Sequence, residues 1–381
     1  MAEAESRSFF KTEKTIADIR EELLVSSFEI WAGVVLQSSA NTVMPILYCD
    51  FDAGQDSLPV SVNSSLAKLL RLLYKSTGTR TDLNKAVSAV FYDTDYDTDP
   101  ATLSQWQEQA VQLPYFQELQ HTPIFLHQET AETELNQLLD GKAAIFAFVN
   151  PFSNSVSLKA LTHLLENSEL GLFMHFTLQD MQVALKRAKN DEAVQVLFGD
   201  RLSQIRDFQK KNRSTDKREE FLFNTFEGLL REKGCYTFRF RINWADKVQT
   251  SRYLVFASKG QQAYTQLKEL MVRYSEVQED GVPLFGANLQ QQQTSLFHEH
   301  YTYSIANLVE DLSQRAADYN NRTVQHVYEK HSISTYYTLE NYKSAFEKLM
   351  RLGIVKFINP KTGQPISKLT TMSLIRYNLR K

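Results

Sequence analysis

The stretch that decides the fold is Pro45-Ile-Leu-Tyr-Cys-Asp-Phe-Asp-Ala-Gly54, an apolar run that ends in two acids and a glycine. A pattern with leucines at positions 66, 69, 70 and 73 follows it. The apolar run predicts a buried strand, the glycine predicts a tight turn, and the leucine spacing predicts an amphipathic helix. This stretch therefore predicts a strand–turn–helix unit with acids at the carboxyl end of its strand.

The same unit repeats along the first two thirds of the chain. Further apolar runs occur at 86–92, 123–127, 143–149 and 172–177, and helical patterns separate them. Two later strands, at 236–242 and 253–257, are expected to form a closing hairpin, and the polar stretch 180–218 is expected to be a helical insertion. The alternation predicts an α/β fold with a mostly parallel, Rossmann-like sheet of the class I methyltransferase type.

The last 80 or so residues have a different pattern. Three helices are expected at 305–317, 323–331 and 338–352, and a hairpin at 354–359 and 368–375 follows them. Three helices and a hairpin predict a winged helix. The domain boundaries that we expect are 1–275 for the Rossmann domain, 276–300 for a Gln-containing linker, and 301–381 for the winged-helix domain.

The predicted winged helix is strongly basic. From Asn341 to Lys381, nine basic residues stand against the single acid Glu347, although the whole chain has a net charge of −3. A basic third helix and wing are typical of nucleic-acid contact, with protein contacts or dimerisation as the alternative. The polar face of the third helix is expected to include Asn341, Ser344 and Glu347. The candidate contacts are Lys343, Lys348, Arg351, Lys356 and Lys361.

Composition excludes several other classes of protein. A length of 381 residues predicts two to three domains, and no apolar run is long enough to span a membrane. The N-terminal residues lack signal-peptide character, so a cytoplasmic protein is expected. Cys49 and Cys235 lie in apolar stretches typical of buried thiols, and His298-Glu-His300 lacks an identifiable third ligand, so no metal site is predicted. Phosphate-binding P-loop and nucleophile-elbow motifs are absent.

Polar residues follow three of the predicted strands. Ligands of an open parallel sheet bind beyond the carboxyl ends of its strands, so these residues are the binding candidates. Each feature alone also fits a helix cap or a turn, but their order is typical of S-adenosylmethionine-dependent methyl transfer. The expected cofactor contacts are Asp50, Asp52, Gly54, Asp93 and Asp95, and the expected catalytic residues, which would hold a target amine and stack on a flipped base, are Asn150, Pro151 and Phe152.

Several segments resemble the three-Cys-motif partner protein family. Ile46-Leu-Tyr-Cys-Asp-Phe-Asp-Ala-Gly54 resembles that family's Ile-Asp-Gly-Phe-Ala-Gly-x-Gly, and Phe148-Val-Asn-Pro-Phe-Ser153 resembles its Ile-Asp-Pro-Phe-Gly. Arg252-Tyr-Leu-Val-Phe-Ala-Ser-Lys259, Leu267-Lys-Glu-Leu-Met271 and the segment from Tyr342 to Gly353 are similar to its later motifs. The resemblance implies a methyltransferase-like Rossmann domain joined to a winged helix. It also implies a separate protein partner that carries a three-cysteine motif.

The chain departs from the family pattern at both glycine-rich motifs. Asp50-Phe-Asp-Ala-Gly-Gln-Asp56 lacks the first and last glycines, and Ser153 replaces another. Two hypotheses therefore stay open. One is a methyltransferase that acts on a nucleic-acid base, and the other is a catalytically inactive scaffold of the same fold that binds nucleic acid or a protein partner. The sequence gives no indication of DNA or RNA, or of the oligomeric state.

Overall fold

The computed structural model describes residues 9–12, 14–38, 45–52, 64–92, 100–126, 128–141, 143–243, 251–288 and 303–378. The chain divides into two compact units, which are described separately. The sheet unit is Phe10–Leu270, and the winged-helix unit is Met271–Lys381 together with the N-terminal residues up to Phe9. None of the helices in the described ranges combines the length and the apolar composition that crossing a bilayer requires.

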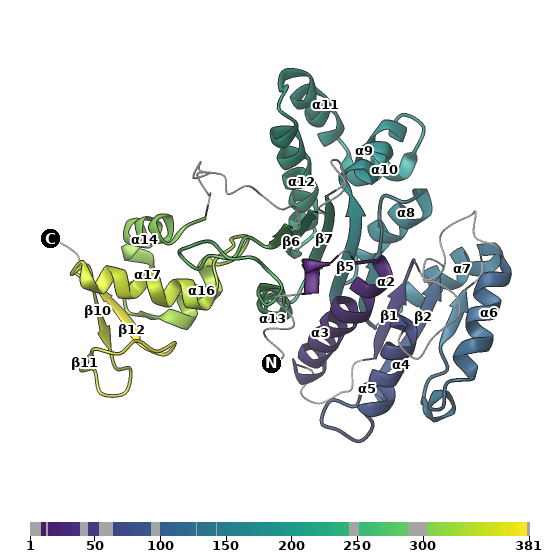
Figure 1. Ribbon diagram of the computed structural model, residues 1–381, viewed down its shortest axis with the longest axis horizontal. Helices are drawn as coiled ribbons and strands as arrows, with labels where there is room; N and C mark the ends of the chain where they lie inside the picture. The colour runs from purple at the N-terminus through teal and green to yellow at the C-terminus, as the bar shows by residue number, and fades with distance from the viewer. Residues whose placement is uncertain are drawn as a thin grey trace. The chain divides into compact units, whose positions relative to one another are not determined.

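The sheet unit is built on a mostly parallel sheet (Figure 1). Within this unit the strand order is β3-β2-β1-β4-β5-β7-β6, and β7 runs antiparallel to both of its neighbours. This order and the closing hairpin confirm the predicted methyltransferase-like α/β fold. The strands are β1 (Ile46–Asp50), β2 (Val87–Tyr92), β3 (Ile124–Leu126), β4 (Ala144–Val149), β5 (Leu170–Thr177), β6 (Tyr236–Asn243) and β7 (Arg252–Ser258).

Helices cover both faces of this sheet (Figure 1). On one face, the rings of Phe28 and Trp31 of α3 pack on Tyr48 and Phe146. The helix approaches so closely that a Cβ on Gly171 would lie 2.6 Å from the indole nitrogen of Trp31. The helices that precede the insertion are α2 (Ile16–Ile19), a π-helical turn (Arg20–Leu24), α3 (Val25–Ser38), α4 (Ser65–Lys75), α5 (Leu83–Ala86), α6 (Pro100–Val111), α7 (Gln128–Leu139) and α8 (Ser155–Leu164).

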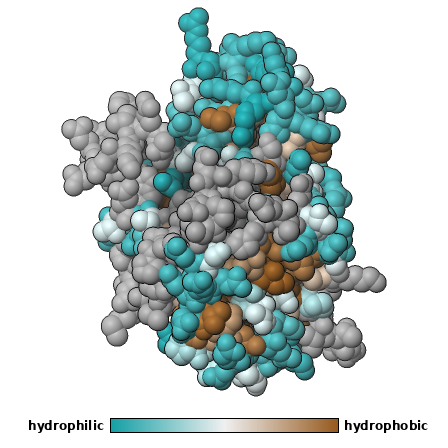
Figure 2. Space-filling view, turned by 90° about the vertical axis from the view of Figure 1, so that its right-hand side faces the viewer, coloured by the Kyte–Doolittle hydropathy of each residue, from teal (hydrophilic) through white to brown (hydrophobic). Residues whose placement is uncertain are grey.

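The segment after β5 is helical, as predicted. It consists of α9 (Leu178–Arg187), α10 (Glu192–Phe198) and α11 (Arg201–Lys211), and it leads into α12 (Thr215–Glu232). The apolar side of α12 completes the core on the second face of the sheet, in one cluster with residues of α8. The surface over α9 and α11, at the top of Figure 2, is mainly hydrophilic. The last helix of the sheet unit is α13 (Gln261–Val272).

The winged-helix unit has its own core of helices on a small antiparallel sheet. The sheet order is β11-β10-β12-β9, and residues such as Leu312, Phe346 and Ile375 fill the interior. The predicted second strand of the hairpin begins later than expected, because Thr370 and Ser373 hydrogen-bond to one another in a turn. The elements are β8 (Gly286–Asn288), α14 (Ile305–Gln314), α15 (Ala316–Tyr319), β9 (Arg322–Thr323), α16 (Val324–His331), α17 (Leu339–Arg351), β10 (Val355–Ile358), β11 (Pro365–Ile366) and β12 (Leu374–Tyr377).

Candidate functional site

The two acids at the end of β1 are buried. Asp50 is 2% exposed and Asp52 is 3% exposed. The backbone N–H of Asp52 donates to Asp50 Oδ1 at 3.0 Å, and the backbone N–H of Phe51 donates to the carbonyl of Phe148 on β4 at 3.0 Å. Each carboxylate therefore lies at the predicted strand end, inside a turn that is tied to the neighbouring strand.

A buried arginine, which the sequence analysis missed, holds this turn. Arg20 lies in the π-helical turn before α3, and its guanidinium nitrogen lies 3.7 Å from the Asp50 carboxylate. The same guanidinium donates to the backbone carbonyl of Asp52 at 2.5 Å and lies over the ring of Phe148, 4.5 Å from its centroid. The sequence did hold a signal, because Arg20 falls on the apolar stripe of its helical pattern, where a charge requires a buried partner.

The segment after β4 meets the same turn through its backbone. The N–H of Asn150 donates to Asp52 Oδ2 at 3.0 Å, and Asn150 Oδ1 accepts a hydrogen bond from the N–H of Phe152 at 3.2 Å. Pro151 is buried. The structure therefore brings Asp52 and Asn150 together, as the topology predicts, and the amide oxygen of Asn150 caps its own turn.

Phe152 points into the core. It is 1% exposed, and its ring centroid lies 4.9 Å from that of Phe176 and 5.1 Å from that of Phe226. In this arrangement the ring offers no face on which a base could stack. The other predicted cofactor residues, Gly54, Asp93 and Asp95, lie outside the described residues.

A buried histidine lies at the same end of the neighbouring strand. His175 of β5 is 4% exposed, and its Nε2 has no hydrogen-bond partner among the described residues. Burial, with the positive charges of Arg252 and Arg20, lowers the pKa of His175 to about 3. The imidazole is therefore neutral at physiological pH.

Among the described residues, the contacts at the strand ends do not fit S-adenosylmethionine. Its ammonium and sulfonium groups are cationic, and a site for them needs carboxylate or carbonyl oxygens that face the ligand. Here the Asp50 carboxylate and the Asp52 carbonyl face the Arg20 guanidinium. Asp52 Oδ2 in turn accepts from the backbone of Asn150. The described strand ends are thus bound to one another.

The described residues contain no group of three or more metal-ligating side chains that could hold an ion. Cys49 and Cys235 are both buried, as predicted. Burial raises the pKa of Cys49 well above its usual range and that of Cys235 to about 11, so both are held as thiols. His298 and His300 lie outside the described residues.

The recognition helix of the winged-helix unit, α17, carries three of the predicted contacts. Lys343 lies 2.6 Å from Glu340, and Arg351 lies 3.8 Å from Glu347, each within the helix. Lys348 is exposed and forms no ion pair among the described residues. Exposed ion pairs of this kind contribute little free energy to stability. All three basic side chains are therefore able to pair with an anion of a ligand.

The prediction that Asn341 faces solvent is wrong. Asn341 is 3% exposed, because it is the third residue of a capping box with Thr338. Its side-chain amide also donates to the carbonyl of Gly281 at 2.9 Å. The residue therefore fixes the start of α17 and is not part of the exposed surface.

The wing carries exposed basic side chains that form no ion pair among the residues that the structure describes. Lys356 of β10 lies directly opposite Arg376 of β12, and both side chains are exposed. Lys361 and Lys368 are exposed in the loops of the wing. The sequence contains no acid after Glu347. Arg376 lies outside the predicted set, although its place in the hairpin could have indicated it.

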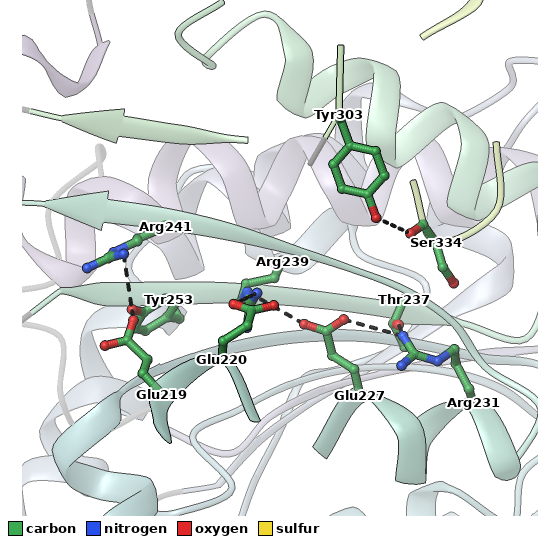
Figure 3. A network of polar contacts seen from close by, with 10 residues as sticks. All are labelled: Glu219, Glu220, Glu227, Arg231, Thr237, Arg239, Arg241, Tyr253, Tyr303 and Ser334. Carbon is green, nitrogen blue, oxygen red and sulfur yellow. Dashed lines mark hydrogen bonds and ion pairs between the residues drawn. The ribbon is translucent and has the colours of Figure 1, made fainter. Parts of the chain in front are cut away.

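A polar network on α12 has a structural role (Figure 3). Glu220 and Glu227 lie 2.8 Å and 3.6 Å from guanidinium nitrogens of Arg239 on β6. Glu219 accepts a hydrogen bond from the Tyr253 hydroxyl. Burial raises the pKa of Glu227, and the arginines around it oppose that shift. These three acids of α12 are therefore directed toward the sheet, where they hold the helix on β6 and β7.

Comparison with known proteins gives one match to a family and several weak structural likenesses. Residues 286–362 match the family model of a GMT-like wHTH domain, that is, a winged helix-turn-helix. No curated protein matches the chain. The winged-helix architecture is thus supported both by the match and by the elements from α14 to β12.

Two kinds of solved structure show weak similarity to this chain. Protein LPL1258 from Legionella pneumophila str. Philadelphia 1, described by the family model DUF519, is 9% identical with a TM-score of 0.33, and the alignment covers 67% of this chain and 92% of that chain. The plantazolicin methyltransferase BpumL, in complex with a pentazolic desmethylPZN analog and SAH, is 9% identical with a TM-score of 0.26, and the alignment covers 68% and 96%. At these TM-scores no function is transferred, and the function is inferred from this chain's own residues.

Proposed function

We propose that this chain binds nucleic acid through the wing and α17 of its winged-helix unit. We propose further that its methyltransferase-like sheet unit is a scaffold without a working cofactor site. The observation that carries the first proposal is the cross-strand pair of Lys356 and Arg376, in a wing whose sequence contains no acid.

Like charges directly opposite one another in a sheet destabilise it. The wing keeps such a pair exposed, and Lys356 forms no ion pair among the described residues. Phosphate groups of a polynucleotide offset this repulsion and release counterions as they bind. A winged helix brings its recognition helix and its wing to one duplex, so Lys348 and Lys361 add to the same surface.

The proposal of a scaffold rests on the strand ends. Arg20 engages Asp50 and Asp52, and Phe152 lies in the core. Methyl transfer to a base is the second candidate, and the place of Asn150 beside Asp52 at the end of β4 favours it. Titration calorimetry with S-adenosylmethionine separates the two. We expect no binding at millimolar cofactor, and micromolar binding that Asp93→Ala abolishes would overturn the scaffold proposal.

Nucleic-acid binding is tested by fluorescence anisotropy over a range of salt concentrations, with duplex DNA, duplex RNA and single strands as separate probes. The variant is Lys356→Gln with Arg376→Gln. Loss of two phosphate contacts should make the negative slope of log affinity against log salt shallower by about 1.8 for duplex DNA. The matched control, Lys75→Gln with Lys85→Gln, removes two exposed lysines from the sheet unit and should leave the slope unchanged. Equal slopes in the two variants, or the absence of binding, would contradict the proposal.

The resemblance to the three-Cys-motif partner family adds a further proposal, a protein partner that carries a three-cysteine motif. A winged helix that serves protein contacts is the corresponding alternative to nucleic-acid binding. Co-purification of such a partner, lost in the wing variant and kept in the control variant, would assign the wing to protein binding.

A further inference from the structure

The helical segment of the sheet unit contains a hollow with a basic rim. It lies between α9, α11 and α12 and has a volume of about 370 Å³. Its apolar floor includes Ile205 and Leu222, both buried. Sites for small organic ligands have volumes of roughly 300–1,000 Å³ and apolar linings with a few polar groups, and this hollow has those properties.

Four cationic side chains border the hollow, namely Lys186, Lys189, Arg206 and Arg218. Lys189 and Arg206 also border an adjoining hollow of about 450 Å³. Among the residues that the structure describes, no acidic side chain lines either hollow. The rim therefore carries uncompensated positive charge that extends from one hollow to the next.

The basic residues of the rim differ from other basic residues nearby, which form ion pairs. Arg201 and Lys210 of the same helix, α11, form ion pairs with Glu232 and Asp207. In contrast, Lys186, Lys189 and Arg206 form no ion pair among the described residues. On α12, Glu219 and Glu220 lie beside arginines of β6 (Figure 3), and Glu232 pairs with Arg201.

Arg218 is held in place at the rim. Its Nε donates to the backbone carbonyl of Asn212, which leaves its terminal nitrogens for other contacts. Two carboxamides, Gln182 and Gln209, also line the hollow. Guanidinium and ammonium groups are the donors that bind phosphate, and glutamine amides can donate to and accept from the edge of a base.

We propose that this hollow binds a nucleoside phosphate, with the phosphate on the cationic rim and the base over the apolar floor. The ligand is either a free mononucleotide or one residue of a single-stranded polynucleotide, since both present the same groups. All of the residues involved belong to the sheet unit. The proposal therefore stands apart from the binding proposed for the wing.

The test is titration calorimetry of the full chain with adenosine monophosphate, adenosine, inorganic phosphate and a short single-stranded oligonucleotide. The variant is Lys189→Gln with Arg206→Gln. The matched control is Lys210→Gln with Lys211→Gln, which removes two exposed lysines from α11 outside the hollow. Because all four side chains are exposed, each variant is expected to fold, and circular dichroism checks this.

We expect a phosphate-bearing nucleotide to bind, and the hollow variant to weaken that binding by about tenfold or more while the control stays within about twofold. The wing variant Lys356→Gln with Arg376→Gln should leave binding of the mononucleotide unchanged. Binding of the mononucleotide identifies a free ligand, and binding of the oligonucleotide alone, again weakened in the hollow variant, identifies a polynucleotide. Equal affinity for inorganic phosphate and the mononucleotide would overturn the proposal, as would equal effects of the two variants or no binding at millimolar ligand.

Discussion

Replacing Arg20 by methionine tests how the ends of β1 and β4 are held. The change keeps much of the apolar stem and removes the charge that lies 3.7 Å from Asp50 and 4.5 Å from the Phe148 ring centroid. Both side chains of the ion pair are at most 2% exposed. Removing one partner of such a buried pair leaves an uncompensated charge and costs about 3–5 kcal/mol. We expect a loss of stability of that size in Arg20→Met.

A double-mutant cycle isolates the interaction. Asp50→Asn should also destabilise the sheet unit, and the double variant should be more stable than the sum of the two losses predicts, by about 2 kcal/mol. Lys68→Met is the matched control, because Lys68 pairs with the partly exposed Glu21 at 2.9 Å. That exposed pair should contribute no more than about 1 kcal/mol.

The assay is urea unfolding followed by tryptophan fluorescence. All three tryptophans of the chain, Trp31, Trp106 and Trp244, lie within the residues of the sheet unit, so the signal reports this unit. Losses in Arg20→Met and Asp50→Asn that add to within about 0.5 kcal/mol would refute the reasoning. A loss in Arg20→Met no larger than that in Lys68→Met would refute it as well.

Two further predictions concern Phe152 and His331. Phe152→Ala should cost the sheet unit about 3–5 kcal/mol in the same urea assay, because the ring is buried in the core; a loss below about 1 kcal/mol would show that the ring is not part of that core. His331 lies 2.6 Å from Asp311 and is buried, and burial lowers its pKa while Asp311 opposes that shift. The folded winged-helix unit should thus lose stability as the pH falls below about 6.5, where the unfolded chain takes up the proton. Nuclear magnetic resonance titration of the imidazole should give a pKa below that value, lower still in Asp311→Asn, and a pKa above it would contradict the structure.

Much of the fold was predictable because it depends on local patterns. The run that became β4 is apolar throughout, and the run that became β1 is apolar up to its last residue, Asp50, since parallel strands buried on both faces need no polar side. The hairpin of β6 and β7 and the three helices of the winged helix followed from the same periodicity. The elements missed were short. They include β9 and β11, which have two residues each and carry no pattern of their own, the four-residue helix α5, and β8, which lies within the predicted linker.

The site was predictable only as far as topology determines it. Parallel strands end at one edge of a sheet, so the proximity of Asp52 and Asn150 followed from the sequence. The role of each side chain did not, because it depends on long-range contacts. Arg20 reaches Asp50 from an element 30 positions earlier in the chain, and Asn341 is buried by a carbonyl 60 positions before it. A motif names the residues at a strand end, but the surrounding structure decides whether they face a ligand.

The cross-strand pair of Lys356 and Arg376 has a practical consequence for work with this protein. Dissolved ions screen the repulsion between the two side chains, so the free wing should become more stable as ionic strength rises. The same ions compete with the protein for phosphate, so affinity for a polynucleotide should fall over that range. The two trends have opposite signs. A storage buffer chosen because it gives the highest melting temperature would therefore be the buffer in which binding is hardest to detect.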